Sequence, residues 1–392
     1  MFSQIFAITG VNLKSIPERW GPSLVIVIGL AGVVAVFTAL LAMSEGFSST
    51  LAATGSRDIA LVMRGGSEVE VNSALGRDEV DLIKLAPGIR KGSDGKPLAS
   101  GEVLVIGELT KKGDPTNSAN ITVRGVEPAG FVLRPKLKVV EGRMFKPGLR
   151  ELIVGRGVAR QYDNAAVGRT IRMRGSEWNV VGVFESGDAH ESELWTDTGV
   201  AQTSFGRNGY SSVLAALESE KSIKTLEAAL KADPRLNVDV VTQQTYFSAQ
   251  TKQFRDTIGA LAVVVTAIMA LGAIFAALNT MYAAVATRAK EIATLRALGF
   301  GGLPVLVSVM LEALVLSLVG GLIGALIAYV LFNNVSVSTL GANFTQVVFA
   351  FKVTPALVGM GLVIAVAVGF IGGLLPSIRA ARMPVTTALR AG

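Results

Sequence analysis

The chain has 392 residues, of which 50% are hydrophobic and 17% charged, with a formal charge of +7 and a pI of about 9.6. It contains no cysteine, which excludes disulfides and thiolate metal sites. A nucleic-acid partner is not expected either, because the long central segment is nearly neutral, with 28 Lys and Arg against 27 Asp and Glu over residues 45–256.

Four apolar runs are each long enough to cross a bilayer, which takes roughly 20 residues of helix. They predict transmembrane helices at 21–44, 257–287, 303–333 and 354–378, with only Glu312 charged inside the third. The fold class is therefore an α-helical membrane protein with four transmembrane helices plus a mixed α+β periplasmic domain, residues 45–256, inserted between helices 1 and 2. A cleaved signal peptide is the alternative for the first run, but its apolar stretch is longer than the usual 7–15 residues.

Charge predicts the orientation of these spans. The short segments on one side carry eight basic residues against two acidic ones (Lys14, Arg19, Arg288, Lys290, Arg296, Arg379, Arg382 and Arg390 against Glu18 and Glu291). The loop at 334–353, on the other side, carries only Lys352. Under the positive-inside rule, both termini and the segment at 288–302 are cytoplasmic, and the inserted domain is outside.

The segments around the spans have their own patterns. Residues 1–20 have loose helical spacing and predict an amphipathic cytoplasmic helix, whereas 379–392 is a cytoplasmic tail. Strand-like runs occur within the inserted domain, and the runs flanking Gly175 and Ser176 predict a hairpin. Lys111–Asn117 is typical of a loop. Residues 242–256 lack Gly and Pro, so we expect the second span to extend from the membrane as a helical stalk, with a strong tilt as the alternative.

No catalytic set is evident in the sequence. His190 is the only histidine and lies in the polar segment Asp188–Glu193, which we interpret as a solvated loop without a metal. The carboxylates of the inserted domain are balanced by basic residues and predict a solvated surface. The phosphate-binding pattern GxxxxGK[ST] is absent. The chain is therefore not expected to hydrolyse ATP by the mechanism that this pattern serves.

Two segments carry a family resemblance. Residues 279–299 read NTMYAAVATRAKEIATLRALG, and residues 373–390 read GLLPSIRAARMPVTTALR. Both resemble MacB/FtsX-type ABC transporter permeases, a class that includes LolC/LolE-like relatives, as do Met310–Gly324 in the third span and Leu152–Ala159 in the inserted domain. The fused ATPase domain of MacB has no counterpart in the sequence. The resemblance therefore implies a transport subunit that is not an enzyme, with ATP and Mg²⁺ bound by a separate ATPase subunit.

The resemblance also implies a coupling helix at 288–302 that contacts the ATPase. Its members would be Arg288, Glu291, Ile292, Leu295, Arg296 and Gly299. The apolar members would enter a groove on the partner and the charged ones would set the register. A merely interfacial loop is the alternative.

The function implied is coupling of ATP hydrolysis to periplasmic conformational work. Within that class we favour export of a hydrophobic or periplasmic substrate from the bacterial inner membrane, with an adaptor and an outer-membrane duct. A second permease copy, in a homodimer or heterodimer, and membrane lipid complete the expected partners. The alternatives are a lipoprotein-extraction permease, an FtsX-like transmitter that controls a cell-wall hydrolase, and a membrane enzyme.

Polar and small residues inside the spans are further candidates. A carboxylate in a lipid-embedded helix costs about 2.5–3.5 kcal/mol, so Glu312 needs a partner. We expect either a contact that changes during transport or a static hydrogen bond, to Asn279 or Thr280. In the third span, Gly320, Gly324 and Ala328 have the spacing of a helix-packing face.

Overall fold

The computed structural model describes residues 9–10 and 20–384. Most of the expected amphipathic helix at 1–20, and the tail beyond Pro384, lie outside the described residues. The chain divides into two compact units, which are described separately. The helical unit comprises residues 1–45, 255–335 and 351–392, and the sheet unit comprises residues 46–254 and 336–350.

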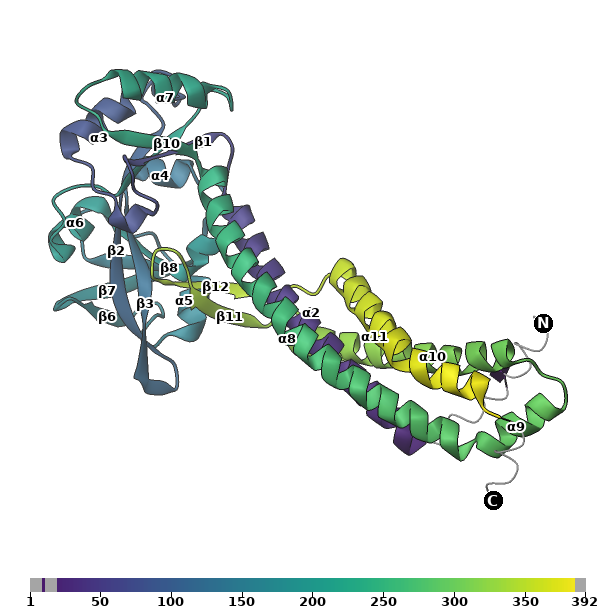
Figure 1. The fold of residues 1–392 in the computed structure, drawn as a ribbon. Coiled ribbons are helices and arrows are strands. Elements are labelled where there is room, and N and C mark those ends of the chain that lie inside the picture. The colour runs from purple at the N-terminus through teal and green to yellow at the C-terminus, as the bar shows by residue number, and fades with distance from the viewer. Residues whose placement is uncertain (1–8, 11–19, 385–392) are drawn as a thin grey trace. The chain divides into compact units, whose positions relative to one another are not determined.

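Among the described residues, four helices are long and apolar enough to cross a membrane, as the sequence predicts. They are α2 (Trp20–Thr54), α8 (Gln243–Thr287), α10 (Gly302–Phe332) and α11 (Pro355–Arg382). The short helix α9 (Ala289–Ala297) follows α8 (Figure 1). Helix α8 is continuous over 45 residues. At 1.5 Å per residue it measures about 68 Å, roughly twice the thickness of a hydrocarbon core.

Small residues allow close packing within the helical unit. A Cβ added to Gly320 of α10 would lie 2.8 Å from the carbonyl oxygen of Val27 in α2, and one on Gly324 would clash with Ala31. Ala328 is fully buried. A Cβ on Gly321 would meet Ala365 of α11 at 2.9 Å. The face of α10 that the spacing indicates therefore lies against α2, and the adjacent face lies against α11.

The sheet unit is built on a ten-stranded mixed sheet. Its order is β10-β1-β9-β2-β3-β8-β5-β7-β4, with β6 paired to β7. The β3–β8 and β5–β7 pairs are parallel, whereas the others are antiparallel. The strands are β1 (Ile59–Arg64), β2 (Ala99–Lys111), β3 (Asp114–Val126), β4 (Lys138–Gly142), β5 (Glu151–Gly155), β6 (Thr170–Met173), β7 (Ser176–Glu185), β8 (Glu193–Asp197), β9 (Ser212–Ala216) and β10 (Val238–Thr242).

Helices pack on this sheet in groups, and each group covers its own hydrophobic core. Helices α3 (Arg77–Lys84) and α7 (Ser222–Ala232) pack on β1, β9 and β10 (Figure 1). Helices α5 (Arg156–Gln161) and α6 (Thr198–Phe205) pack over a second core, in which Tyr162 and Trp178 are fully buried. The remaining short helices are α4 (Pro128–Val132), η2 (Glu70–Asn72) and η3 (Ala189–Ser192).

Turn residues explain two hairpins of this sheet. The expected β6–β7 hairpin is present, and its turn places Arg174 and Gly175 at φ 46° and 74°. The expected loop at Lys111–Asn117 is wrong for most of its length, because β3 begins at Asp114. Only the residues around Gly113, at φ 78°, form the turn. Polar side chains on the exposed end of a hairpin give it the composition of a loop.

The segment expected as a simple loop at 334–353 contains a further hairpin, β11 (Ser336–Leu340) and β12 (Gln346–Ala350). This hairpin belongs to the sheet unit. Its Thr345 hydroxyl lies 2.7 Å from that of Thr122 in β3, and the Val348 amide donates to the Ser192 hydroxyl at 2.7 Å. The chain between the last two spans is therefore hydrogen-bonded to the inserted domain.

Candidate functional site

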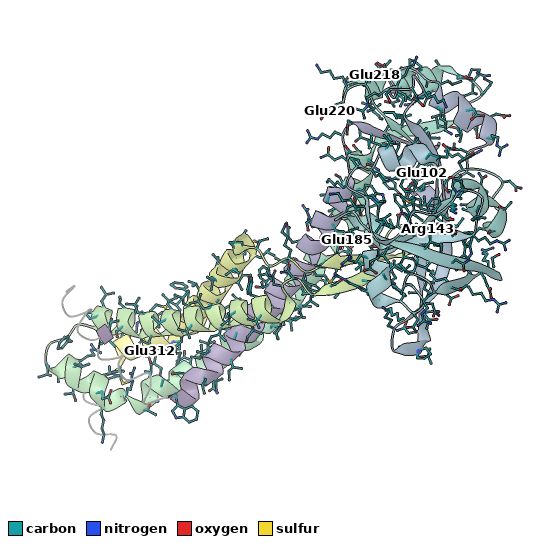
Figure 2. The ribbon with its side chains drawn as sticks, turned by 180° about the vertical axis from the view of Figure 1, so that it is seen from behind. Glu102, Arg143, Glu185, Glu218, Glu220 and Glu312 are labelled. Carbon is teal, nitrogen blue, oxygen red and sulfur yellow. The ribbon has the colours of Figure 1, made fainter. Side chains whose placement is uncertain are left out.

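A buried ion pair connects the start of the expected coupling helix to the third span. Arg288 lies directly after α8, and its Nη1 donates to a carboxylate oxygen of Glu312 in α10 at 2.7 Å. Both residues are 5% exposed, and Glu312 lies among the long helices (Figure 2). The expected partners were wrong, since Asn279 is exposed and Arg288 supplies the hydrogen bond. An ionisable pair, and not an isolated carboxylate, therefore lies in this helical unit.

The far end of α9 is fixed by a second polar contact. Arg296 donates from Nη1 to the carbonyl oxygen of Met383 at 2.6 Å, directly beyond α11. Between these two contacts, Ile292 is 7% exposed and packs in a cluster with Val305 and Val309 of α10. Helix α9 is thus held against α10 and the end of α11 along one side.

This packing bears on the docking role expected for the apolar side chains of α9. Ile292 is already buried within the chain, whereas Leu295 is partly buried against the same cluster. Gly299 ends the segment with φ 94°, a conformation that favours glycine. The exposed side consists of other residues: Lys290, Glu291, Thr294, Ala297 and Leu298.

The sheet unit contains a larger group of buried charges. Arg124 of β3 pairs with Glu102 of β2 at 2.8 Å, with Glu193 of β8 at 2.7 Å and with Glu70 of η2 at 3.2 Å. Arg134 pairs with the other oxygen of Glu102 at 2.6 Å. The expectation of an ordinary solvated surface is wrong for these carboxylates. One signal was available, since Arg124 interrupts an otherwise apolar strand run.

The surroundings of these carboxyl groups set their ionisation. Burial raises the pKa of Glu102, but the nearby Arg134 and Arg124 guanidiniums outweigh it and lower that pKa to about 2. For Glu193, burial likewise opposes Arg124, and the net effect is a lowered pKa. These carboxylates are therefore ionised at neutral pH despite their burial.

His190 is part of the same region and is not a solvated loop residue. Its side chain is buried, with Nδ1 3.0 Å from an Asp188 oxygen, and Nε2 accepts from Arg134 Nε at 3.2 Å. Across residues 9–10 and 20–384, no group of three or more potential metal-ligating side chains is found. His190 thus has a structural hydrogen-bonding role here.

Comparisons with known proteins agree with this architecture. A family model described as the MacB-like periplasmic core domain matches residues 23–233, and one described as the FtsX-like permease C-terminal matches residues 263–385. The chain belongs to the MacB/FtsX family of ABC transporter permeases. The inserted domain is therefore of the periplasmic-core type.

Relatives extend over nearly the whole chain. The uncharacterized ABC transporter permease YvrN of Bacillus subtilis is 26% identical over 97% of this chain and 96% of its own length. The macrolide export ATP-binding/permease protein MacB of Bdellovibrio bacteriovorus is 25% identical over 93% of this chain, which spans 58% of that protein. The solved periplasmic region of MacB from Actinobacillus actinomycetemcomitans aligns with 50% of this chain and 94% of its own, at 13% identity and a TM-score of 0.38.

Proposed function

We propose that this permease couples ATP hydrolysis by a partner ATPase to conformational work of its external domain. The observation that carries the proposal is the two-sided character of α9. One side is held by Arg288, Ile292 and Arg296, while the other is exposed. A helix anchored in this way can receive a force at its exposed side and pass it to α8, α10 and α11.

The exposed side has the chemistry of a protein contact. Leu298 is 73% exposed directly beyond α9, next to Thr294 and the charged pair Lys290 and Glu291. An apolar anchor surrounded by charged residues suits a groove on a soluble partner. In this proposal Leu298, with Glu291, takes the docking role that the sequence suggested for Ile292 and Leu295.

The distribution of charge and the length of α8 give the proposed direction in which the motion is transmitted. In this proposal, the basic excess around α9 and the two termini puts them on the cytoplasmic side of a bacterial inner membrane. Helix α8 would then extend outward and carry motion to the periplasmic domain. Two permease copies with two ATPases, which bind ATP and Mg²⁺, would form the working complex. Export of a hydrophobic or periplasmic substrate through an adaptor and an outer-membrane duct is the output we favour.

A single substitution tests the ATPase contact. In the permease–ATPase complex, Leu298→Asp should abolish stimulation of ATP hydrolysis while leaving the permease folded. Leu149→Asp is the matched control, because Leu149 is an exposed leucine of the sheet unit, at 49%. Equal stimulation by both variants would remove this face of α9 from the coupling step.

The orientation is tested separately, because the chain has no cysteine of its own. Single cysteines would be introduced as Ser93→Cys and Thr294→Cys and treated with an impermeant thiol reagent, with any outer membrane permeabilised. We expect labelling of the position-93 variant alone. Labelling of the position-294 variant alone would reverse the topology.

A further inference from the structure

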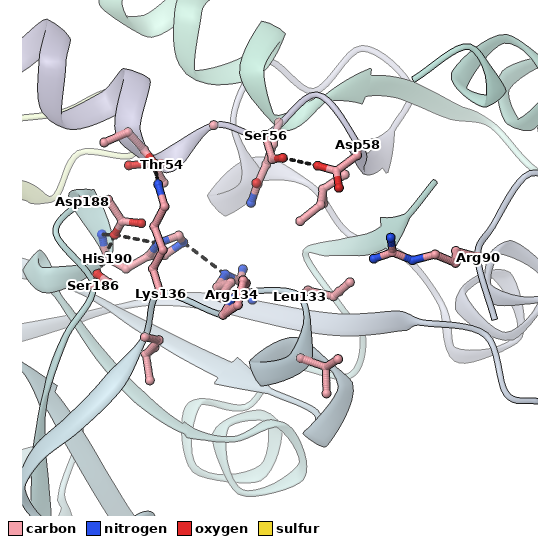
Figure 3. Close-up of a pocket in the computed structure, with 17 residues that line it drawn as sticks. Thr54, Ser56, Asp58, Arg90, Leu133, Arg134, Lys136, Ser186, Asp188 and His190 are labelled. Carbon is pink, nitrogen blue, oxygen red and sulfur yellow. Dashed lines mark hydrogen bonds and ion pairs between the residues drawn. The ribbon is translucent and has the colours of Figure 1, made fainter. Parts of the chain in front are cut away.

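A polar pocket lies within the sheet unit, where α2 ends and α8 begins. Its volume is about 230 Å³, roughly that of eight waters. It is lined by the end of α2, the start of α8, the segment 132–137 after α4, and the segment at 186–190 (Figure 3). All of these residues belong to the sheet unit. The proposed coupling function makes no use of this pocket.

The carboxylates of the pocket already have partners. Asp58 accepts from the hydroxyl of Ser56, and Asp188 accepts from Ser186 at 2.6 Å and contacts His190 at 3.0 Å (Figure 3). Arg134 is likewise engaged, because Glu102 neutralises its guanidinium from behind. These groups form the wall of the pocket and leave no carboxylate without a donor.

The side chains left for a ligand are hydrogen-bond donors. Arg90 points into the pocket from the side opposite His190, and no hydrogen bond or ion pair of its guanidinium is found among the described residues (Figure 3). Within residues 20–384, the one hydrogen bond found for Lys136 Nζ is to the Ala53 carbonyl, at the long distance of 3.4 Å. Gln243 is 4% exposed, and its side-chain amide has no hydrogen-bond partner within the described part of the chain.

The Gln243 amide lines the pocket and can donate a hydrogen bond to a ligand there. Two cations on opposite sides favour a negatively charged ligand, and the planar guanidinium matches a carboxylate or phosphate. Apolar side chains complete the wall, with Ile59 and Leu133 inside and Val132 at the rim, 62% exposed. Donors and apolar surface together suit an anionic head with a short apolar group.

We propose that this pocket binds a small amphiphilic anion, a carboxylate or phosphate monoester, through Arg90, Lys136 and Gln243. The anion could come from solution or from a lipid headgroup, since both present the same chemistry. Occupancy would connect the end of α2, the start of α8 and the loop after α4 through one ligand.

The experiment uses the full chain in nanodiscs of zwitterionic lipid. A single cysteine introduced as Val132→Cys, labelled with a small trifluoromethyl group, reports on the rim by fluorine NMR. Hexanoate and hexyl phosphate are the probes, and hexanol and hexylammonium are the uncharged and cationic controls. We expect saturable shifts with at least one anion and none with the controls.

Variants assign the contacts. Arg90→Gln should weaken anion binding roughly tenfold or more, as expected for loss of a charged hydrogen bond. Gln243→Leu should weaken it several-fold, whereas Arg172→Gln, at an exposed arginine of β6, should leave affinity unchanged. A second set of nanodiscs contains anionic phosphatidylglycerol and no free anion. If the fluorine signal shifts in these nanodiscs and the shift disappears with Arg90→Gln, the ligand is a lipid headgroup. If the signal shifts only when an anion is dissolved in the buffer, the ligand is soluble.

Either result, a lipid headgroup or a soluble anion as the ligand, supports the proposed site. Absence of a saturable shift with every anion overturns the proposal, as does an affinity that is the same with and without Arg90→Gln. These results are independent of ATPase stimulation, so failure here would leave the coupling proposal standing on its own test.

Discussion

The two units bury charge in different ways. The helical unit has the pair Arg288–Glu312 inside an apolar bundle. The sheet unit has a network in which Arg124 and Arg134 share Glu102, and Arg124 also contacts Glu70 and Glu193. The sheet network joins β2, β3, β8 and η2, whereas the pair joins the helix-connecting segment to one span.

The difference matters when one member is removed. A carboxyl group that loses its partner can take up a proton and become neutral, but a guanidinium stays charged at any ordinary pH. Removal of Glu102 leaves two buried guanidiniums short of a counter-charge. Removal of Arg288 leaves Glu312, which can be neutralised. We therefore expect the sheet network to be the more sensitive of the two.

The largest effect is expected from Glu102→Ala. It should lower the free energy of unfolding of the sheet unit by about 4 kcal/mol, the cost of breaking a buried ionic contact. Glu218→Ala, at an exposed position, is the control and should change it by less than about 0.5 kcal/mol. Denaturant unfolding followed by the buried Trp178 and Trp195 measures both. Equal losses would mean that the network contributes nothing to stability.

The next largest effect is expected from acid, which should lower the free energy of unfolding of the same sheet unit. The pKa of Glu102 is about 2 in the folded chain and near 4.5 when unfolded, so the unfolded state binds more protons between those values. The stabilisation contributed by Glu102 is therefore fully present above pH 4.5 and is lost as pH falls toward 2. The shift corresponds to about 3 kcal/mol. Unfolding measured against pH should show this slope in the natural chain and a smaller one with Glu102→Gln; identical slopes would contradict the assignment.

A smaller loss is expected from Arg288→Met, about 2 kcal/mol, since Glu312 can be neutralised by a proton. Adding Glu312→Leu should recover much of the stability, because no carboxyl then remains in the bundle. The measurement is a double-mutant cycle on unfolding of the full chain in detergent. Additive losses would show that the two side chains do not interact.

The smallest effect concerns packing of the helical unit. Gly320→Ala should destabilise it by about 1 kcal/mol, because the new methyl group meets the Val27 carbonyl. Gly272→Ala is the matched control, since nothing lies within 4 Å of its Cβ position, and it should be neutral or slightly stabilising by about 0.5 kcal/mol. Thermal unfolding of the two variants compares them directly, and a Gly320→Ala variant as stable as the control would contradict this packing.

Sequence reasoning succeeded where a pattern is local and periodic. The four apolar runs predicted the four long helices, and the residues around Gly175 predicted the β6–β7 hairpin. Small-residue spacing singled out Gly320 and Gly324, both of which lie against α2. In each case the residues that form the pattern lie close together in the sequence, so the pattern can be recognised locally.

Sequence reasoning failed where the hydrogen-bonding or ion-pair partner of a residue is distant in the chain. Arg124 lies 54 positions from Glu70 and 69 from Glu193, and Arg134 lies 56 from His190. Apart from the strand run that Arg124 interrupts, nothing local distinguishes these residues from surface charges. The hairpin β11–β12 was missed for a similar reason, because its docking through Thr345 and Val348 depends on Thr122 and Ser192. Arg288 was counted as a cytoplasmic charge because the sequence did not show its pairing with Glu312.

The central claim is that α8 transmits motion as one continuous helix. Gln253→Pro would remove a backbone hydrogen bond near its start and kink it, at a cost of about 3 kcal/mol, without touching α9. Gln253→Ala is the control. ATP hydrolysis by the permease–ATPase complex and output in the periplasm should be measured side by side. The account predicts retained hydrolysis with lost output for the proline variant alone, and normal output with the proline present would contradict it.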